Sequence, residues 1–151
     1  MSSRDEIMTM INQYCFTLDT GNKRGMAELF EHGEWNVEGA PPCRGTEEVL
    51  AALAHVRMYP DGTPRTKHVT TNVELSIDEE AGTATAQSYC TVFQQTDEFP
   101  LQANFVGHYF DDFERVDGTW RWKKRLIRNP LLGDFSANMT DAGDVVPGAS
   151  S

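Results

Sequence analysis

Four long segments in the second half of the chain show the alternating pattern of β-strands. They cover residues 67–78, 83–95, 101–116 and 119–128, and only short breaks separate them. The last break is Asp117-Gly118, a dipeptide typical of a two-residue hairpin turn. Strands joined by tight turns run antiparallel. The pattern therefore predicts an antiparallel meander, which constrains the fold more than any other feature of the sequence.

The residues that precede the meander are mostly helical in pattern. Residues 3–18 place apolar side chains at spacings of three and four, as one face of a helix does, and Gly21 follows as a terminator. Two shorter helices are predicted at residues 23–32 and 45–59, with a short strand at 34–39 between them. Helices followed by a curved antiparallel sheet indicate the α+β class, with the helices on one face of the sheet.

A long twisted sheet wrapped around one helix is expected to form a cone-shaped α+β barrel. Side chains cannot fill such a cone completely, so we predict a blind apolar cavity as the place of function. The domain is predicted to span residues 1–135, because Leu131, Leu132 and Phe135 can dock on it. Residues 136–151 end in small and polar side chains, and we expect a partly disordered C-terminal tail there.

Composition argues against several classes of function. The 151 residues carry 13 basic and 23 acidic side chains, and the net charge of −10 disfavours a nucleic-acid partner. The N-terminus shows no signal-peptide pattern, and no stretch approaches the roughly 18 apolar residues of a membrane span. We therefore expect a cytoplasmic protein with no membrane partner. The three cysteines lack the spacing of a zinc site or of a disulfide framework.

Asp19 occupies an electrostatically poor position at the predicted C-terminal end of the first helix, where the helix dipole disfavours a carboxylate. That end must lie across the sheet, so Asp19 can reach the mouth of the cone and meet His68 from the first long strand. A carboxylate bound to one imidazole nitrogen makes the other nitrogen a stronger base. Tyr14, one turn back, can present its hydroxyl to the same cavity. The residues alone also allow a solvated helix end, a core tyrosine and a strand histidine without a chemical role.

Several stretches of the sequence carry a resemblance to a known family. They are YCFTLDTGNKRGMAELF, GEWNVEGAPPCRGTEEVL, KHVTTNVELSI and GHYFDDFERVDGTWRWKKR, and they span nearly everything from Tyr14 to Arg125. They resemble the SnoaL-like group of the nuclear-transport-factor-2-like superfamily. Within it, the chain resembles the hexachlorocyclohexane dehydrochlorinases first and the scytalone and bile-acid dehydratases next. The resemblance implies a cystatin-like fold with the cone-shaped sheet predicted above.

The resemblance also implies roles for individual residues. The catalytic aspartate and histidine of the family fall on Asp19 and His68, and its active-site arginine falls on Arg125. A tyrosine of the bile-acid dehydratases falls on Tyr14. The apolar or aromatic cavity positions fall on Trp35, Phe105 and Tyr109. The chain departs from its relatives at two positions: the dehydrochlorinases have a lysine where Tyr14 stands, and the second strand histidine of scytalone dehydratase would fall near Phe93.

These roles imply an enzyme without cofactor or metal that acts on a small hydrophobic ligand of the aromatic, polycyclic or steroid-like kind. His68, held by Asp19, would take a proton from carbon. Tyr14 would donate a hydrogen bond to a carbonyl or leaving hydroxyl, and Arg125 would balance the developing anion. Such an enzyme would be a dehydratase-like lyase, an isomerase or a cyclase. The alternative is a non-catalytic ligand-binding or assembly domain, similar to the small subunits of ring-hydroxylating dioxygenases.

The alternation in the first long strand does not fit a regular strand with His68 in the cavity. His68 stands at an even position, whereas the apolar residues from Val69 to Ile77 stand at odd ones. A regular strand would therefore place His68 on the face opposite the apolar residues. Either the two belong to different layers, or a β-bulge changes the phase. We predict a bulge near residues 70–72, because bulges re-aim side chains and curve a sheet.

A similar argument applies to the last strand. Arg125 stands at an odd position, whereas Trp120 and Trp122 stand at even ones. If Arg125 enters the cavity, both tryptophans are expected on the outer face of the sheet. An exposed aromatic stripe of this kind predicts a homo-oligomer, a dimer or a trimer.

Overall fold

The computed structural model describes residues 1–140 of the chain. Its elements are α1 (Ser3–Asp19), α2 (Lys23–Glu28), β1 (Glu34–Val37), β2 (Cys43–Arg44), α3 (Gly45–Leu53), β3 (Thr66–Asp78), β4 (Thr83–Gln94), β5 (Gln102–Val116) and β6 (Thr119–Leu132). The strands form one sheet in the order β2-β1-β6-β5-β4-β3. β1 and β6 are parallel, and the other neighbouring strands are antiparallel.

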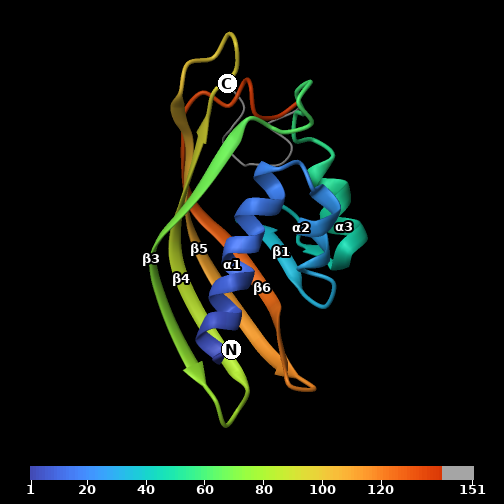
Figure 1. The fold of residues 1–151 in the computed structure, drawn as a ribbon, viewed down its shortest axis with the longest axis vertical. Helices are drawn as coiled ribbons and strands as arrows, with labels where there is room; N and C mark the ends of the chain where they lie inside the picture. The colour runs from blue at the N-terminus through green and yellow to red at the C-terminus, as the bar shows by residue number, and fades with distance from the viewer. Residues whose placement is uncertain (141–151) are drawn as a thin grey trace.

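The α+β class and the antiparallel meander from β3 to β6 are confirmed. Figure 1 shows α1 lying along one face of the curved sheet, with α2 and α3 beside it. The sheet stays open, because β2 and β3 are its two edges, so the cone is not a closed barrel. The predicted helices at 23–32 and 45–59 are shorter in the structure, where they end at Glu28 and Leu53.

Local hydrogen bonds cap α1 at both ends. The hydroxyl of Ser2 accepts a hydrogen bond from the backbone N–H of Asp5 at 3.1 Å and caps the N-terminus. At the other end, two backbone hydrogen bonds form a Schellman motif, the shorter running from the N–H of Asn22 to the carbonyl of Thr17 at 2.8 Å. Gly21 supplies the φ of +81° that this motif requires. The end of α1 is thereby fixed in position.

The predicted bulge in β3 is confirmed. Between Thr71 and Glu74 the strand advances by three residues while its partner β4 advances by two. Asn72 lies within this step and has a φ of +56°. The more buried side chains of β3 are the even-numbered ones before the bulge and the odd-numbered ones after it. The bulge therefore places His68 and the apolar residues of β3 on the same face of the sheet.

A further bulge, in β6, places the tryptophans on the inner face of the sheet and not on the predicted outer face. Between Trp122 and Lys124 the strand advances by two residues while β5 advances by one, which leaves Lys123 without a partner and exposed. As a result, Arg125 shares the inner face with both tryptophans, and Trp120, Trp122 and Arg125 are only 3%, 0% and 0% exposed. The prediction of exposed tryptophans is wrong, because residue parity does not carry through a bulge.

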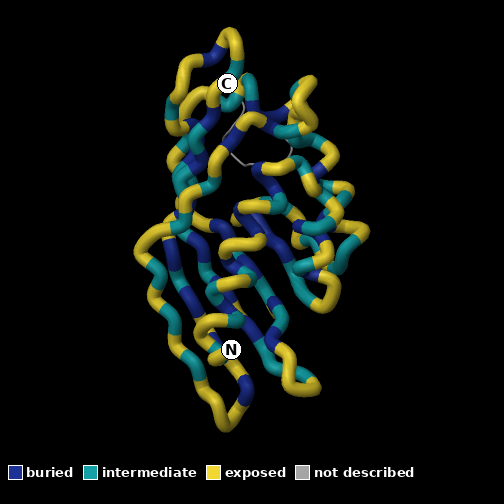
Figure 2. The backbone as a smooth tube through the Cα atoms, viewed as in Figure 1, coloured by how far each residue is buried: buried dark blue, intermediate teal, exposed yellow. Residues whose placement is uncertain are grey.

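The core lies between α1 and the inner face of the sheet. Ile7 and Ile11 on α1 are fully buried, and Cys15 and Cys90 are buried as free thiols. Figure 2 shows long buried stretches where the strands pass beneath the helices, whereas the turns are exposed. None of the helices within residues 1–140 is both long and apolar enough to cross a membrane.

The chain remains packed beyond Phe135, the predicted end of the domain. Val56 and Met139 form an isolated antiparallel bridge, and Asn138 and Met139 are buried. The segment that follows β6 therefore belongs to the folded unit as far as Thr140. The remainder of the predicted tail, residues 141–151, lies outside the described residues.

The close approach of two turns at Gly21 leads to a stability prediction. A Cβ atom at Gly21 would lie 2.0 Å from the carbonyl oxygen of Gly62, whereas one at Gly62, also with a φ of +81°, would have nothing within 4 Å. We expect Gly62→Ala to lower the free energy of unfolding by about 1–2 kcal/mol through backbone strain, and Gly21→Ala by roughly 3 kcal/mol or more. Urea unfolding measures both, and equal losses would contradict the close approach.

Candidate active site

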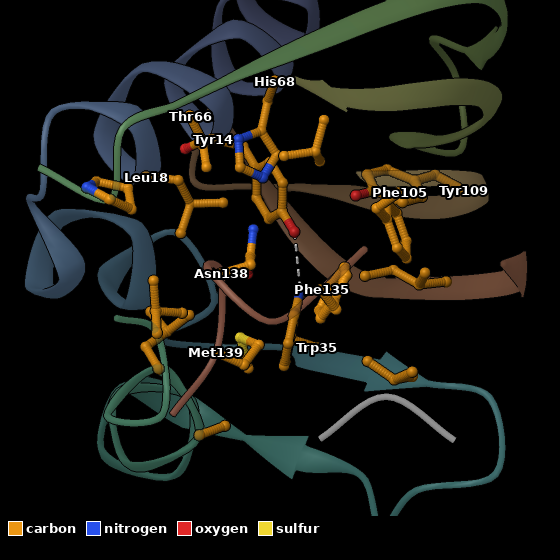
Figure 3. A pocket seen from close by; sticks show the side chains of 17 residues that line it. Tyr14, Leu18, Trp35, Thr66, His68, Phe105, Tyr109, Phe135, Asn138 and Met139 are labelled. Atoms are coloured by element: carbon orange, nitrogen blue, oxygen red, sulfur yellow. Dashed lines mark hydrogen bonds between the residues drawn. The ribbon is translucent and has the colours of Figure 1, made fainter. Parts of the chain in front are cut away.

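A cavity of about 100 Å³ lies between α1, the inner face of the sheet and the segment after β6. Most of the 17 side chains around it are apolar or aromatic, and they come from both helices and strands (Figure 3). Polar groups are few: Thr66, His68 and Asn138, together with the hydroxyl or N–H groups of aromatic residues. An apolar cavity with a few convergent polar groups is typical of a small-molecule site.

The structure brings Asp19 and His68 together at the edge of this cavity. Nδ1 of His68 lies 2.6 Å from Oδ1 of Asp19, and the backbone N–H of His68 donates to Oδ2 at 2.7 Å. The hydroxyl of Thr66 donates to Oδ1 at 2.8 Å. The Asp19 side chain is 8% exposed and that of His68 14%. Three donors therefore hold a nearly buried carboxylate against the imidazole ring.

These donors also determine the charge of Asp19. Burial by itself raises the pKa of the carboxyl group, but the hydrogen bonds and the charge of His68 and the hydroxyl of Thr66 together more than offset it. The pKa of Asp19 therefore lies below its ordinary value, and the group is a carboxylate at neutral pH. A carboxylate accepts only, so the proton of a neutral His68 ring resides on Nδ1 and leaves Nε2 as the basic nitrogen.

Tyr14 presents its hydroxyl to the cavity from the middle of α1. The indole N–H of Trp35 donates to this hydroxyl oxygen at 3.1 Å, as the dashed line in Figure 3 marks. Burial raises the pKa of Tyr14 to about 12, although the nearby charge of Arg125 partly opposes the shift. The hydroxyl is therefore protonated at neutral pH. With one lone pair occupied by Trp35, its proton can be donated to a ligand.

Two expected site residues, Asp19 and Arg125, do not line the cavity themselves. Asp19 contacts the cavity residue His68, whereas Arg125 is bound elsewhere. Nε and Nη2 of Arg125 donate to the carboxylate of Asp111 at 2.7 and 2.9 Å, and both side chains have no exposed surface. The guanidinium carbon lies 4.3 Å from the ring centroid of Tyr14 and 4.4 Å from that of Tyr109, and both of these rings line the cavity. Direct contact between Arg125 and a ligand is therefore absent from this arrangement.

The ion pair with Asp111 fixes the charge of Arg125. Burial lowers the pKa of Arg125, but the charge and the hydrogen bonds of Asp111 reverse the shift and hold the pKa above its ordinary value. Nη1 of Arg125 has no hydrogen-bond partner within residues 1–140. Arg125 is thus a permanent cation that acts on the cavity through the faces of two tyrosine rings.

The remaining expected residues, Trp35, Phe105 and Tyr109, all line the cavity. Residues that the sequence did not lead us to include are Thr66, which binds Asp19, and Asn138. Thr66 could have been found, because it lies two residues before His68 and so on the same face of β3. Asn138 follows the last strand, where no periodicity indicates the direction of a side chain.

The strand histidine His108 does not join Asp19 and His68. Nε2 of His108 lies 3.0 Å from Oε1 of Gln87, and its ring packs 4.3 Å from that of Phe110. Its neighbour Tyr109 faces the cavity, so His108 faces the outer side of the sheet. No group of three or more potential metal ligands occurs in the described part of the chain.

Comparison with protein families identifies the fold family. The SnoaL-like domain matches residues 1–126. The chain belongs to the SnoaL-like family. No functionally curated protein matches the chain significantly.

Solved structures agree with this assignment. A protein of unknown function from Mycobacterium tuberculosis superposes with a TM-score of 0.69 at 25% identity, covering 93% of this chain and 79% of its own. A Novosphingobium aromaticivorans protein assigned as a scytalone dehydratase has a TM-score of 0.67 at 24% identity, with 87% of each chain covered. A hexachlorocyclohexane dehydrochlorinase from Novosphingobium barchaimii has a TM-score of 0.66 at 23% identity, covering 87% of this chain and 92% of its own. A further neighbour is described as an NTF2-like protein with a cystatin-like fold. These likenesses establish the nuclear-transport-factor-2-like fold.

The lowered pKa of Asp19 predicts how stability depends on pH. An unfolded aspartate has a pKa of about 3.9, so stabilisation by Asp19 is complete above that pH and is lost as the pH falls through the lower folded pKa. We expect the free energy of unfolding of wild type to exceed that of Asp19→Asn most near neutral pH, with the difference shrinking below about pH 4. Urea unfolding across this range measures it. A difference in unfolding free energy that does not change with pH would contradict the lowered pKa of Asp19.

The buried ion pair yields a second prediction. Removing Asp111 leaves the cation of Arg125 buried and uncompensated, so Asp111→Leu is expected to lower the free energy of unfolding by about 3–5 kcal/mol. The double variant with Arg125→Met buries no charge and should recover much of this loss. Urea unfolding of both variants is the measurement, and a double variant less stable than Asp111→Leu would be inconsistent with this picture.

Proposed function

We propose that this protein is a small-molecule enzyme that abstracts a proton from carbon in a hydrophobic ligand. The supporting observation is the 2.6 Å contact between Asp19 and Nδ1 of His68 at the edge of an apolar cavity. Asp19 keeps the proton on Nδ1 and stabilises the imidazolium that forms when Nε2 takes a second proton. His68 is the proposed base, and Asp19 is the residue that orients it.

Tyr14 is the proposed electrophilic partner. Its hydroxyl lies in the cavity with its proton free for donation, because Trp35 supplies the hydrogen bond that the oxygen accepts. Donation to a carbonyl or leaving hydroxyl would stabilise the negative charge that develops as His68 removes a proton. Tyr14 and His68 are therefore proposed to act on neighbouring atoms of one ligand.

Arg125 is proposed to be a positioning residue and not a ligand for the anion. Its guanidinium lies against the rings of Tyr14 and Tyr109, and its charge lowers the pKa of Tyr14 against the effect of burial. A lower pKa makes the Tyr14 hydroxyl a stronger hydrogen-bond donor. The influence of Arg125 on the reaction is thus expected to pass through Tyr14.

Elimination is the proposed reaction type, with isomerisation and cyclisation as outcomes of the same proton abstraction. Among the structures with this fold, one is assigned as a scytalone dehydratase and another is a hexachlorocyclohexane dehydrochlorinase, and both names denote eliminations. Tyr14 favours an oxygen leaving group, since a phenol donates well to a departing hydroxyl. None of the proposed steps needs a cofactor.

A second proposal concerns assembly. The outer face of the sheet carries a cluster of three rings, Tyr89, His108 and Phe110. The ring centroid of His108 lies 5.0 Å from that of Tyr89 and 4.3 Å from that of Phe110. Tyr89 is 45% exposed, and the helices cover the opposite face. We propose that a second copy of the chain covers this face. Light scattering of wild type should give a dimer or trimer and Tyr89→Arg a smaller species, whereas a monomeric wild type would rule the assembly out.

The catalytic proposal is tested by proton exchange in heavy water. Native mass spectrometry identifies co-purified compounds, and these, together with cyclohexanone as a simple carbon acid, are incubated with the protein while NMR follows deuterium uptake. We expect His68→Ala to lower the exchange rate by about 10²–10⁴-fold, because it removes the base. His32→Ala is the control, because this exposed histidine lies outside both the cavity and the proposed interface and should leave the rate unchanged.

The same experiment distinguishes the alternative. If compounds bind to wild type but their C–H groups exchange no faster than with His68→Ala, the chain is a ligand-binding or assembly domain. That outcome would leave the fold and the cavity intact and would contradict the proposed chemistry.

A further inference from the structure

One polar side chain of the cavity has no place in the proposed chemistry. Asn138 belongs to the segment after β6, is 8% exposed, and lines the cavity together with Phe135 and Met139. Figure 3 shows its amide group pointing into the cavity, on the side where Tyr14 and His68 also lie. Its side chain makes no hydrogen bond within residues 1–140, and its amide is accessible from the cavity.

The backbone on both sides of Asn138 is held firmly. The carbonyl of Ala137 accepts hydrogen bonds from Nε2 of Gln94 at 2.9 Å and from the hydroxyl of Tyr59. The carbonyl of Asn138 accepts from the N–H of Arg57 at 2.9 Å. These contacts tie the segment to β4 and to the loop after α3. The direction of the Asn138 side chain is therefore set by the fold.

Further hydrogen bonds hold Gln94, which binds the carbonyl of Ala137, in place. Gln94 also donates to the carbonyl of Pro64 at 3.0 Å and accepts from the amide of Asn104 at 2.9 Å. Gln94 and Asn104 are 1% and 0% exposed, so this network is part of the core. The anchored segment therefore presents the donor and acceptor groups of the Asn138 amide to the cavity, where a ligand with a polar substituent can pair with them.

The volume of the cavity limits the size of that ligand. A dry protein cavity of about 150 Å³ accepts a molecule of benzene. The cavity here is about 100 Å³, which is smaller than that benzene cavity, so a ligand larger than a single ring does not fit the observed arrangement. The ligand is therefore of single-ring size.

We propose that Asn138 is a specificity-determining residue, and that the substrate is a single-ring compound with two polar substituents. One substituent is bound by the hydroxyl of Tyr14 and the other by the amide of Asn138, which can donate or accept. That the bound compound is a substrate rests on the proposed function, in which His68 is the base. The binding preference itself requires no proton transfer.

The test compares phenol, which has one hydroxyl, with the three benzenediols, which have two. Isothermal titration of the full chain gives the dissociation constants. At least one benzenediol is expected to bind wild type about threefold to tenfold more tightly than phenol, the value of one additional hydrogen bond. Asn138→Leu, which is similar in shape, should abolish this preference and leave the binding of phenol close to wild type.

Three controls accompany the measurement. Ser136→Ala alters an exposed side chain of the same segment and should keep the preference. Asn138→Ala should lose it as Asn138→Leu does, and circular dichroism verifies that both variants fold. His68→Ala should keep the preference, so a failure of the exchange experiment and a failure of this one are separate results.

Three outcomes would overturn the proposal. The first is a preference for a benzenediol that persists in both Asn138 variants. The second is the absence of binding of any of the four single-ring compounds to wild type. The third is tighter binding of 1-naphthol than of phenol to wild type, because a second ring should not fit the cavity.

Discussion

The contact between the end of α1 and the start of β3 organises the site. A carboxylate at the C-terminal end of a helix is disfavoured by about 0.3–1 kcal/mol, whereas each hydrogen bond to a charged group contributes about 1.5–3 kcal/mol. Asp19 accepts from the ring and the backbone N–H of His68 and from Thr66, so its hydrogen bonds outweigh the dipole. The same bonds position the imidazole, which links the stability of the helix end to the proposed chemistry.

Two irregularities in the sheet give the cavity its composition. The bulge in β3 turns His68 and the later apolar residues to one face, and the bulge in β6 brings Arg125 and Trp122 to that same face. Arg125 is then buried against Asp111 beneath the rings of Tyr14 and Tyr109. The cavity wall is therefore aromatic and uncharged on this side, while a fixed cation lies behind it and polarises the rings.

Much of the fold could be predicted, because strand alternation and helix periodicity are strong along most of the chain. The bulge in β3 was predictable, since the apolar residues of that strand are out of phase with His68, whereas the bulge at Lys123 was not. In β6 the aromatic residues keep one parity up to Trp122, and a regular strand fits them equally well. Asn138 follows β6 in a segment without periodicity, and only tertiary hydrogen bonds to its backbone set its direction.

The central claim is that Asp19 holds the proton of His68 on Nδ1, which leaves Nε2 as the base facing the cavity. NMR of the two ring nitrogens in ¹⁵N-labelled protein, above the pH at which the ring becomes charged, measures this directly. The account predicts the Nδ1–H form in wild type and a change of tautomer in Asp19→Ala, with His108 unaffected in both. A wild-type His68 ring protonated on Nε2, or a tautomer that does not respond to Asp19→Ala, would contradict it.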